Sequence, residues 1–237
     1  MKLDESEFDR FADEYRQLHA NVITASGEAP EYFAEYKVAD LVNHAAARSV
    51  SVKRILDFGC GVGTSSRYFL NCFPDAEIVG IDVSGKSLEI ARSRYGEEVT
   101  YSLLDEVIDY PENSFDVAFA ACVFHHIPWE EHRKWLSEIH RVLRRGGLVA
   151  IFEHNPWNPL TVHAVNTCEF DKNARLMTAH HLRKTLGDVR FEAVRHHYRI
   201  FFPRKLASLR PMERYLSWMP LGAQYSVTAQ KEKHIDR

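Results

Sequence analysis

The sequence ILDFGCGVGT at residues 55–64 decides the fold of this 237-residue chain. Its apolar start ends abruptly at Gly59, and glycines then occupy every second position up to Gly63. Glycine suits a backbone that must adopt positive φ or that a ligand must approach closely. The following residues, 62–73, have the pattern of a helix, whose N-terminus offers free N–H groups and a positive dipole end. The stretch therefore predicts a strand, a glycine turn and a helix built around a ligand.

The same alternation continues on both sides of this unit and predicts an α/β fold with a mostly parallel sheet. Apolar runs without polar alternation are typical of strands that helices cover on both faces. The predicted strands are 52–58, 76–82, 99–104, 114–124, 148–154, 189–202 and 223–231, and the predicted helices are 4–19, 26–46, 62–73, 84–96 and 128–147. We expect an N-terminal helical cap over residues 1–50 and a domain over 51–237. A helical insertion at about 203–220 separates the last two strands, which favours an antiparallel edge.

Composition excludes several classes of protein. The chain is 45% hydrophobic and 27% charged, with a formal net charge of −3. The apolar fraction is too high for a disordered chain, and the balanced charge argues against a dedicated nucleic-acid binder. The acidic N-terminus has no signal-peptide pattern, and no apolar stretch is long enough to cross a membrane. We therefore expect a cytoplasmic protein whose four cysteines are free thiols.

Two acidic residues follow the predicted second and third strands. Asp82 stands 19 residues after Gly63, where an acid in a nucleoside-binding α/β fold accepts hydrogen bonds from ribose hydroxyls. Asp105 ends the third strand, where it can accept a bond from an adenine amino group. A dinucleotide fingerprint requires G-x-G-x-x-G, but here Thr64 occupies the last position. The pattern thus favours a nucleoside ligand and argues against a nicotinamide dinucleotide.

The ensemble of motifs resembles the class I S-adenosylmethionine-dependent methyltransferases of the small-molecule type. Residues 55–64 resemble their first motif and residues 78–84 their second, while residues 114–127 resemble the fourth-strand motif. The turn at 143–148 resembles their L-x-P-G-G turn, with Arg145 where proline is usual. This resemblance covers about residues 50–155. It implies a Rossmann-like, seven-stranded sheet with an antiparallel last strand and S-adenosyl-L-methionine as the cofactor.

The resemblance also implies a set of cofactor-binding residues. The three glycines would let the backbone approach the methionine part, and Asp57 would hold its amino group. Tyr15 either closes over the cofactor carboxylate or packs within its own apolar stripe. The predicted cofactor-binding residues are Asp57, Gly59, Cys60, Gly61, Gly63, Asp82, Val83, Asp105, Ala121 and Tyr15.

Polar residues after the fourth and fifth predicted strands are the candidate catalytic groups. They are His126, Glu153 and His154, and histidine suits a general base because it titrates near neutral pH. A histidine at this point can equally pack beside the cofactor. We predict no metal site, because adjacent histidines such as His125 and His126 would diverge on a strand. The chain also lacks the Asn/Asp-Pro-Pro-Tyr signature of methyltransferases that act on DNA amino groups.

The basic C-terminal region, residues 190–237, does not identify the methyl acceptor. Residues 190–237 hold ten Lys and Arg against four Asp and Glu. Arg204 and Arg210 are either part of a solvated helix face or part of a lid that meets an anionic acceptor. Contact with a membrane or a lipid-linked substrate is a third reading. The sequence thus predicts methyl transfer to an oxygen or nitrogen of a small molecule. The alternatives are a cofactor-binding module without turnover and a nicotinamide-dependent oxidoreductase, and the oligomeric state stays open.

Overall fold

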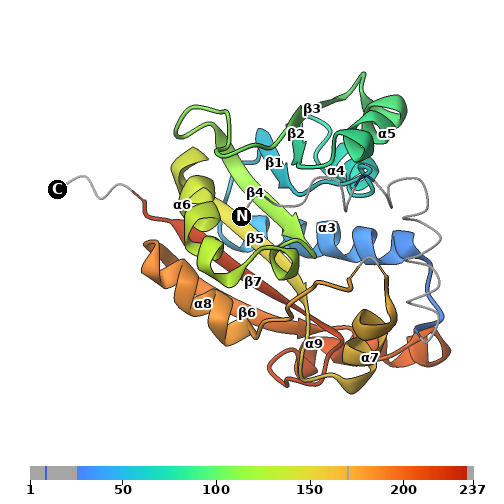
Figure 1. The fold of residues 1–237 in the computed structure, drawn as a ribbon. Helices are drawn as coiled ribbons and strands as arrows, with labels where there is room; N and C mark the ends of the chain where they lie inside the picture. Colours follow the sequence, from blue (N-terminus) through green and yellow to red (C-terminus); the bar gives the residue numbers. More distant parts are fainter. Residues whose placement is uncertain (1–8, 10–25, 170, 234–237) are drawn as a thin grey trace.

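The fold is an α/β sandwich around one seven-stranded sheet (Figure 1). The computed structural model describes residue 9 and residues 26–169 and 171–233, so Tyr15 and all of the predicted helix at 4–19 except residue 9 lie outside the described residues. The strands are β1 (Arg54–Phe58), β2 (Glu77–Asp82), β3 (Val99–Leu103), β4 (Phe115–Ala121), β5 (Leu143–His154), β6 (Phe191–Arg199) and β7 (Gln224–Lys231). The helices of the sandwich are α3 (Pro30–Ala47), α4 (Ser66–Cys72), α5 (Gly85–Tyr95), α6 (His132–Val142), α7 (Pro159–Thr167) and α8 (Ala179–Asp188).

The order of the strands confirms the predicted Rossmann-like fold. They run β3-β2-β1-β4-β5-β7-β6 across the sheet. The pairs from β3 to β5 are parallel, whereas β7 is antiparallel to both β5 and β6. The reversal places Gln224, the first residue of β7, opposite His154 of β5 and Arg199 of β6. The carboxyl ends of the parallel strands and the start of β7 therefore meet at one edge, where open α/β sheets bind their ligands.

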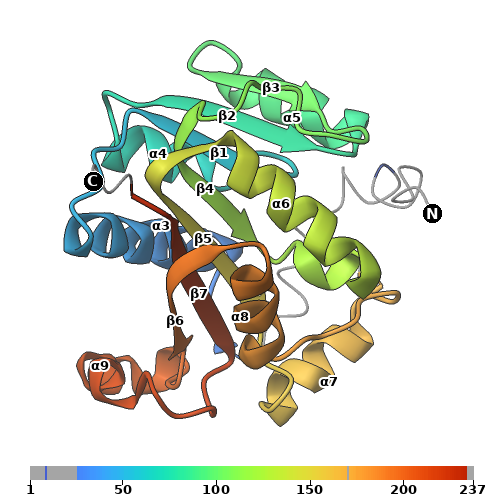
Figure 2. The ribbon, with the colours of Figure 1, turned by 90° about the vertical axis from the view of Figure 1, so that its left-hand side faces the viewer.

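Each face of the sheet has its own apolar core. On one face Leu136 of α6 and Leu182 of α8 are fully buried against the sheet, and both helices lie in front of it in Figure 2. On the other face α3, α4 and α5 contribute Leu41, Phe69 and Leu88, which are also fully buried. Helix α3 is thus part of the helical layer of the domain, although the sequence assigned its residues to a separate cap.

Two segments differ from the sequence predictions. The helix expected over 128–147 begins as the short 3-10 turn η3 (Trp129–Glu131) and ends at Val142. Leu143 already pairs with Phe115 of β4, and Leu148 pairs with Val117. The glycines at 146 and 147 therefore lie inside β5, where the register shifts between these two pairs. Helices α7 and α8 were not predicted. Both begin at a capping side chain, because Asn158 accepts a hydrogen bond from the Thr161 N–H and Thr178 from the His181 N–H.

The insertion between β6 and β7 is helical, as expected. It contains the 3-10 segment η4 (Arg204–Met212) and the single turn α9 (Glu213–Leu216). The Glu213 carboxylate accepts the backbone N–H groups of residues 200, 201 and 202, which fixes the insertion where it leaves the sheet. Within the described part of the chain, the helices are all too short or too polar to cross a bilayer.

Candidate active site

The glycine turn after β1 needs glycine at its three alternate positions. The φ angles of Gly59, Gly61 and Gly63 are +73°, +52° and +74°, a region that side chains disfavour. A Cβ at Gly59 would lie 2.5 Å from Val123 Cγ2, whereas a Cβ at Gly61 would meet nothing within 4 Å. The N–H groups of Gly59 and Cys60 donate to the Ile81 carbonyl, which ties the turn to β2. Gly61 thus presents bare backbone to open space.

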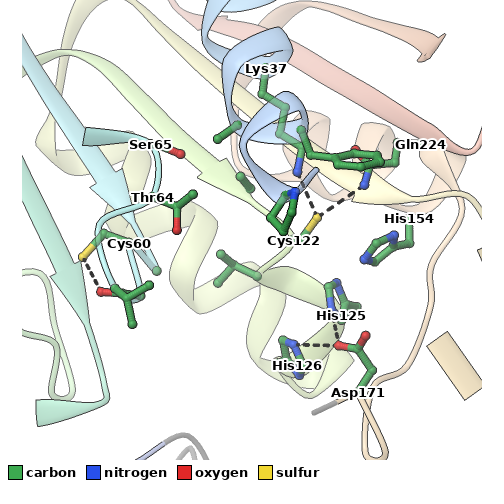
Figure 3. A pocket seen from close by; sticks show the side chains of 18 of the residues that line it. Lys37, Cys60, Thr64, Ser65, Cys122, His125, His126, His154, Asp171 and Gln224 are labelled. Atoms are coloured by element: carbon green, nitrogen blue, oxygen red, sulfur yellow. Dashed lines mark hydrogen bonds and ion pairs between the residues drawn. The ribbon is translucent and has the colours of Figure 1, made fainter. Parts of the chain in front are cut away.

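That space is a cavity of about 590 Å³ at the carboxyl edge of the sheet. Its wall comes from the glycine turn, from the ends of β2, β4 and β5, from α3 and α7, and from the segment after β6. Figure 3 shows that Lys37, Cys122, His125, His126, His154 and Asp171 gather at one side of it. The cavity is large enough to hold a cofactor beside a second small molecule.

Two acidic residues form the polar part of the cavity near the turn. Asp57 is 3% exposed, and its Oδ2 has no hydrogen-bond partner among the described residues. Burial, reinforced by the neighbouring Asp82, raises the pKa of Asp57 to about 8. Asp82 accepts the N–H of Gly61 at 2.7 Å and that of Ser84 at 2.9 Å. Burial nevertheless raises the pKa of Asp82. The unpartnered Asp57 oxygen suits a cationic ligand group.

Most of the predicted cofactor-binding residues are brought together. Seven of the ten line the cavity: Asp57, Gly59, Cys60, Gly61, Asp82, Val83 and Ala121. Gly63 packs beneath the turn, where a Cβ would lie 2.9 Å from the Tyr101 hydroxyl. Asp105 is exposed and does not line the cavity, and the preceding Leu104 takes that place. Asp105 thus lies one residue beyond the wall.

The three candidate catalytic residues lie in different environments. His126 and His154 line the cavity, but Glu153 is 1% exposed and does not. The Glu153 carboxylate lies 2.6 Å from His125 Nδ1 and accepts the backbone N–H groups of Val123 and Phe124. It therefore anchors the short 3-10 turn η2 (Phe124–His126) that carries both histidines. Burial and the adjacent His125 lower the pKa of His126 to about 3, so its imidazole is neutral at pH 7.

The structure adds a thiol that the sequence reasoning left aside. Cys122 follows β4 with a φ of +59° and lines the cavity. The buried Lys37 ammonium lies 3.2 Å from Cys122 Sγ. Burial alone would raise the pKa of this thiol, but Lys37 and His154 lower it to about 6. The signal was present in the sequence, because Lys37 lies one helical turn from Phe33 and from Leu41, on the buried side of α3.

Lys37 should control the reactivity of Cys122, since the thiolate is the nucleophilic form. We expect Cys122 to react with iodoacetamide at an apparent pKa of about 6 and Lys37→Met to shift this midpoint upward. The alkylation rate at pH 6.5 should fall about threefold for the first pKa unit by which the midpoint rises above 6 and about tenfold per unit beyond that. Mass spectrometry of each cysteine against pH measures this, with the exposed Cys72 as internal control. An unchanged midpoint would contradict the ion pair.

The basic insertion does not place its arginines in the cavity wall. Arg210 donates to the Glu28 carboxylate, and its guanidinium lies 4.6 Å from the centre of the Tyr32 ring. Neither Arg204 nor Arg210 lines the cavity, which Pro203 and Phe201 reach instead. Of the three readings left open for these arginines, contact with an anionic acceptor in this cavity therefore gains no support. Arg210 fixes the insertion to the start of α3.

A family model described as a methyltransferase domain matches residues 55–147, which include the glycine turn and the strands β1 to β4. Trans-aconitate 2-methyltransferase of Methylobacterium radiotolerans is 34% identical over 96 residues, or 40% of this chain and 36% of that protein. Demethylmenaquinone methyltransferase of Thermotoga maritima is 31% identical over 153 residues, or 64% of this chain and 61% of that protein. The chain thus spans less than two thirds of either relative.

Solved structures share the fold over nearly the whole chain. A methyltransferase of Thermotoga maritima, described as a possible histamine N-methyltransferase, superposes with a TM-score of 0.68 and 20% identity, and the match covers 96% of this chain and 99% of that one. Phosphoethanolamine N-methyltransferase 2 of Haemonchus contortus, solved with S-adenosyl-L-methionine, gives a TM-score of 0.58 and 19% identity over 81% of this chain and 52% of that one. The chain therefore carries a match to a methyltransferase domain over residues 55–147, and its strand order and glycine turn agree with the resemblance to the class I S-adenosylmethionine-dependent methyltransferases.

Proposed function

We propose that this protein transfers the methyl group of S-adenosyl-L-methionine to an oxygen or nitrogen of a small molecule. One observation carries the proposal: the cavity joins Asp57, whose Oδ2 has no partner among the described residues, and the bare backbone of Gly61 to a second polar region at the end of β4. When bound, the cofactor supplies an activated methyl group on its sulfonium. The protein then has mainly to orient the acceptor and to hold it in the correct protonation state.

Each polar group near the glycine turn has a role in binding. Asp57 would accept hydrogen bonds from the amino group of the cofactor, whose positive charge offsets the cost of burying a carboxylate. Asp82 would accept the ribose hydroxyls, since the backbone bonds at Gly61 and Ser84 hold it facing the cavity. Leu104 and Val83 would cover the base with apolar surface.

Two histidines line the side of the cavity where the acceptor would bind. A neutral imidazole can accept a proton from a hydroxyl or ammonium, but a pKa of about 3 makes His126 a weak base. Glu153 acts differently, as a positioning residue that holds the η2 turn through Val123, Phe124 and His125. We therefore assign the proton transfer to His154 and contact with the acceptor to His126.

The buried Lys37 favours an acceptor with a negative group. Lys37 is 5% exposed, and it lines the cavity with its ammonium beside Cys122. A buried cation is stabilised by an anion within contact distance, whether the Cys122 thiolate or a ligand carboxylate. One relative is named for trans-aconitate and another for demethylmenaquinone, so carboxylate and quinol acceptors are the first to screen.

Isothermal titration with S-adenosylmethionine, its demethylated product and NAD tests the cofactor. We expect one equivalent of the first two to bind and NAD to give no heat. Formation of the demethylated product with a panel of anionic and phenolic acceptors then tests turnover. Binding of NAD with no binding of S-adenosylmethionine would overturn the proposal, and tight cofactor binding without turnover on any acceptor would favour a binding module.

A further inference from the structure

We propose that His125, His126 and Asp171 bind one divalent transition-metal cation of the zinc type in the wall of the cavity. All three line the cavity, and one ligand atom from each lies within 4.8 Å of the others. Figure 3 shows the two imidazoles and the carboxylate turned toward one another. The sequence had predicted no metal site, and the site goes beyond the methyl transfer proposed above.

The two distances from Asp171 to the imidazoles fit a shared cation better than hydrogen bonds. Asp171 Oδ1 lies 3.5 Å from His125 Nε2 and 3.4 Å from His126 Nε2. Charge-assisted N–H···O bonds are shorter, at about 2.7–2.9 Å. In a tetrahedral zinc site with bonds of about 2.0–2.2 Å, neighbouring ligand atoms are about 3.4 Å apart. The carboxylate thus keeps the spacing of a metal ligand from both rings.

The local backbone explains why two adjacent histidines converge. Residues 125 and 126 belong to the η2 turn, where the chain does not alternate as it does on a strand. Their ring centroids are 4.2 Å apart, with an interplanar angle of 44°. The sequence prediction of divergence assumed that the β4 strand continued through this point. The strand ends at Ala121, and the positive φ of Cys122 turns the chain into the cavity wall.

Glu153 contacts the ring nitrogen of His125 that does not face Asp171. Its Oε2 lies 2.6 Å from His125 Nδ1, while its Oε1 accepts two backbone N–H groups. A neutral His125 that donates from Nδ1 to Glu153 keeps the lone pair of Nε2 for a cation. Metal-bound histidines regularly donate their second nitrogen to such a carboxylate, which fixes the ring and strengthens the bond to the metal. The buried Glu153 therefore has a function without touching the cavity.

The donor set indicates the class of cation. Two imidazole nitrogens and one carboxylate oxygen suit zinc and neighbouring transition metals and are a poor match for calcium or magnesium. Three protein ligands would leave a coordination position open, as in catalytic zinc sites, and all three ligands line the cavity. The bound cation would hold an acceptor oxygen and lower its proton affinity. This role rests on the proposed methyl transfer, whereas the binding of the cation does not.

Titration of the metal-free, full-length protein with Zn²⁺ tests the site, with Co²⁺ absorption in the visible range as a second readout. We expect one equivalent to bind, and Asp171→Asn and His126→Gln each to weaken that binding about 100-fold or more. Glu153→Gln, whose side chain can still accept both backbone N–H groups, should weaken it about 10–100-fold. Asp188→Asn is the matched control, because Asp188 is exposed and lies near Arg133 on the surface.

The Zn²⁺ titration can overturn the metal site without overturning the proposed methyl transfer. Absence of a stoichiometric Zn²⁺ site, or equal affinity in wild type and Asp171→Asn, would overturn the proposal and leave His125 as an imidazolium between two carboxylates. Titration of the same samples with S-adenosylmethionine separates this result from the proposed function. Cofactor binding without Zn²⁺ binding would reject only the metal site, and Zn²⁺ binding without cofactor binding would reject only the methyl transfer.

Discussion

Replacing Asp57 with Asn should weaken the binding of S-adenosylmethionine about 10–100-fold while making the cofactor-free protein more stable at pH 8. A hydrogen bond to a charged group contributes about 1.5–3 kcal/mol, and each 1.4 kcal/mol corresponds to a tenfold change in affinity. The gain in stability arises because Asp57 is buried and its Oδ2 has no partner among the described residues. One substitution would thus change binding and stability in opposite directions.

The effect on stability depends on pH with a defined sign. The pKa of Asp57 is about 8 in the folded protein and about 4 in the unfolded chain. The folded state therefore keeps a proton that the unfolded state has lost, and stability falls as the pH rises from about 4 to about 8. Between pH 6 and 8 the loss should be roughly 2 kcal/mol, and Asp57→Asn should remove it.

Thermal unfolding of both proteins at pH 6, 7 and 8 measures this difference. Titrations of the cofactor at pH 7 in buffers of different ionisation enthalpy should show a proton released by the wild type and none by Asp57→Asn. Asp116→Asn is the control, since Asp116 is buried but bonded to two backbone N–H groups and Arg144. It should lower stability and leave cofactor affinity unchanged. A stability loss in Asp57→Asn at pH 8 would count against an unpaired carboxylate.

Gly59→Ala and Gly61→Ala should separate the folding role of the glycine turn from its binding role. Both residues have positive φ, which costs an alanine about 1–2 kcal/mol. At Gly59 the added Cβ also meets Val123 at 2.5 Å, so the total loss should be about 2–4 kcal/mol. At Gly61 the Cβ meets no protein atom within 4 Å and projects into the cavity that the cofactor would fill.

Gly59→Ala should therefore lower the melting temperature by roughly 5–12 °C, as its loss of stability implies for a chain of this size. Gly61→Ala should lower it much less but weaken cofactor binding at least tenfold. Calorimetric unfolding and cofactor titration of the two variants check this. Gly85→Ala is the matched control, because a Cβ there meets nothing within 4 Å and its φ is not positive. Equal cofactor affinity in wild type and Gly61→Ala would place the cofactor elsewhere in the cavity.

The half of the fold that the glycine turn organises was predictable from the sequence. Short apolar runs between helical patterns predicted the strands, and an apolar run after a long connection predicted β7 at the antiparallel position. The predictions of secondary structure were wrong or incomplete where the local sequence is compatible with more than one structure. Arg144, Arg145 and the glycines that follow resemble a helix end, but pairing with β4 draws them into β5. Helices α7 and α8 had readable caps at Asn158 and Thr178, which periodicity alone did not reveal.

The acceptor side of the site was less predictable, because it depends on contacts between distant segments. Asp171 meets His125 and His126 across 45 residues of chain, and Lys37 meets Cys122 across 85. No local pattern encodes such pairs. Glu153 was singled out for its place after the fifth strand, but only the tertiary structure shows that it faces the η2 turn and not the cavity.

The reversal of β7 has a consequence for how such proteins diversify. Because β6 and β7 are antiparallel neighbours, residues 200–223 leave and re-enter the sheet at the same edge, with Arg199 opposite Gln224. Phe201 and Pro203 from this segment line the cavity, whereas the glycine turn lies on the other half of the sheet. The segment can therefore be lengthened, shortened or exchanged as a closed loop without moving a strand. If the proposed function holds, this segment can change the acceptor side of the cavity without changing the glycine turn, and we expect exchange of residues 200–223 between relatives to alter the acceptor while cofactor affinity is kept.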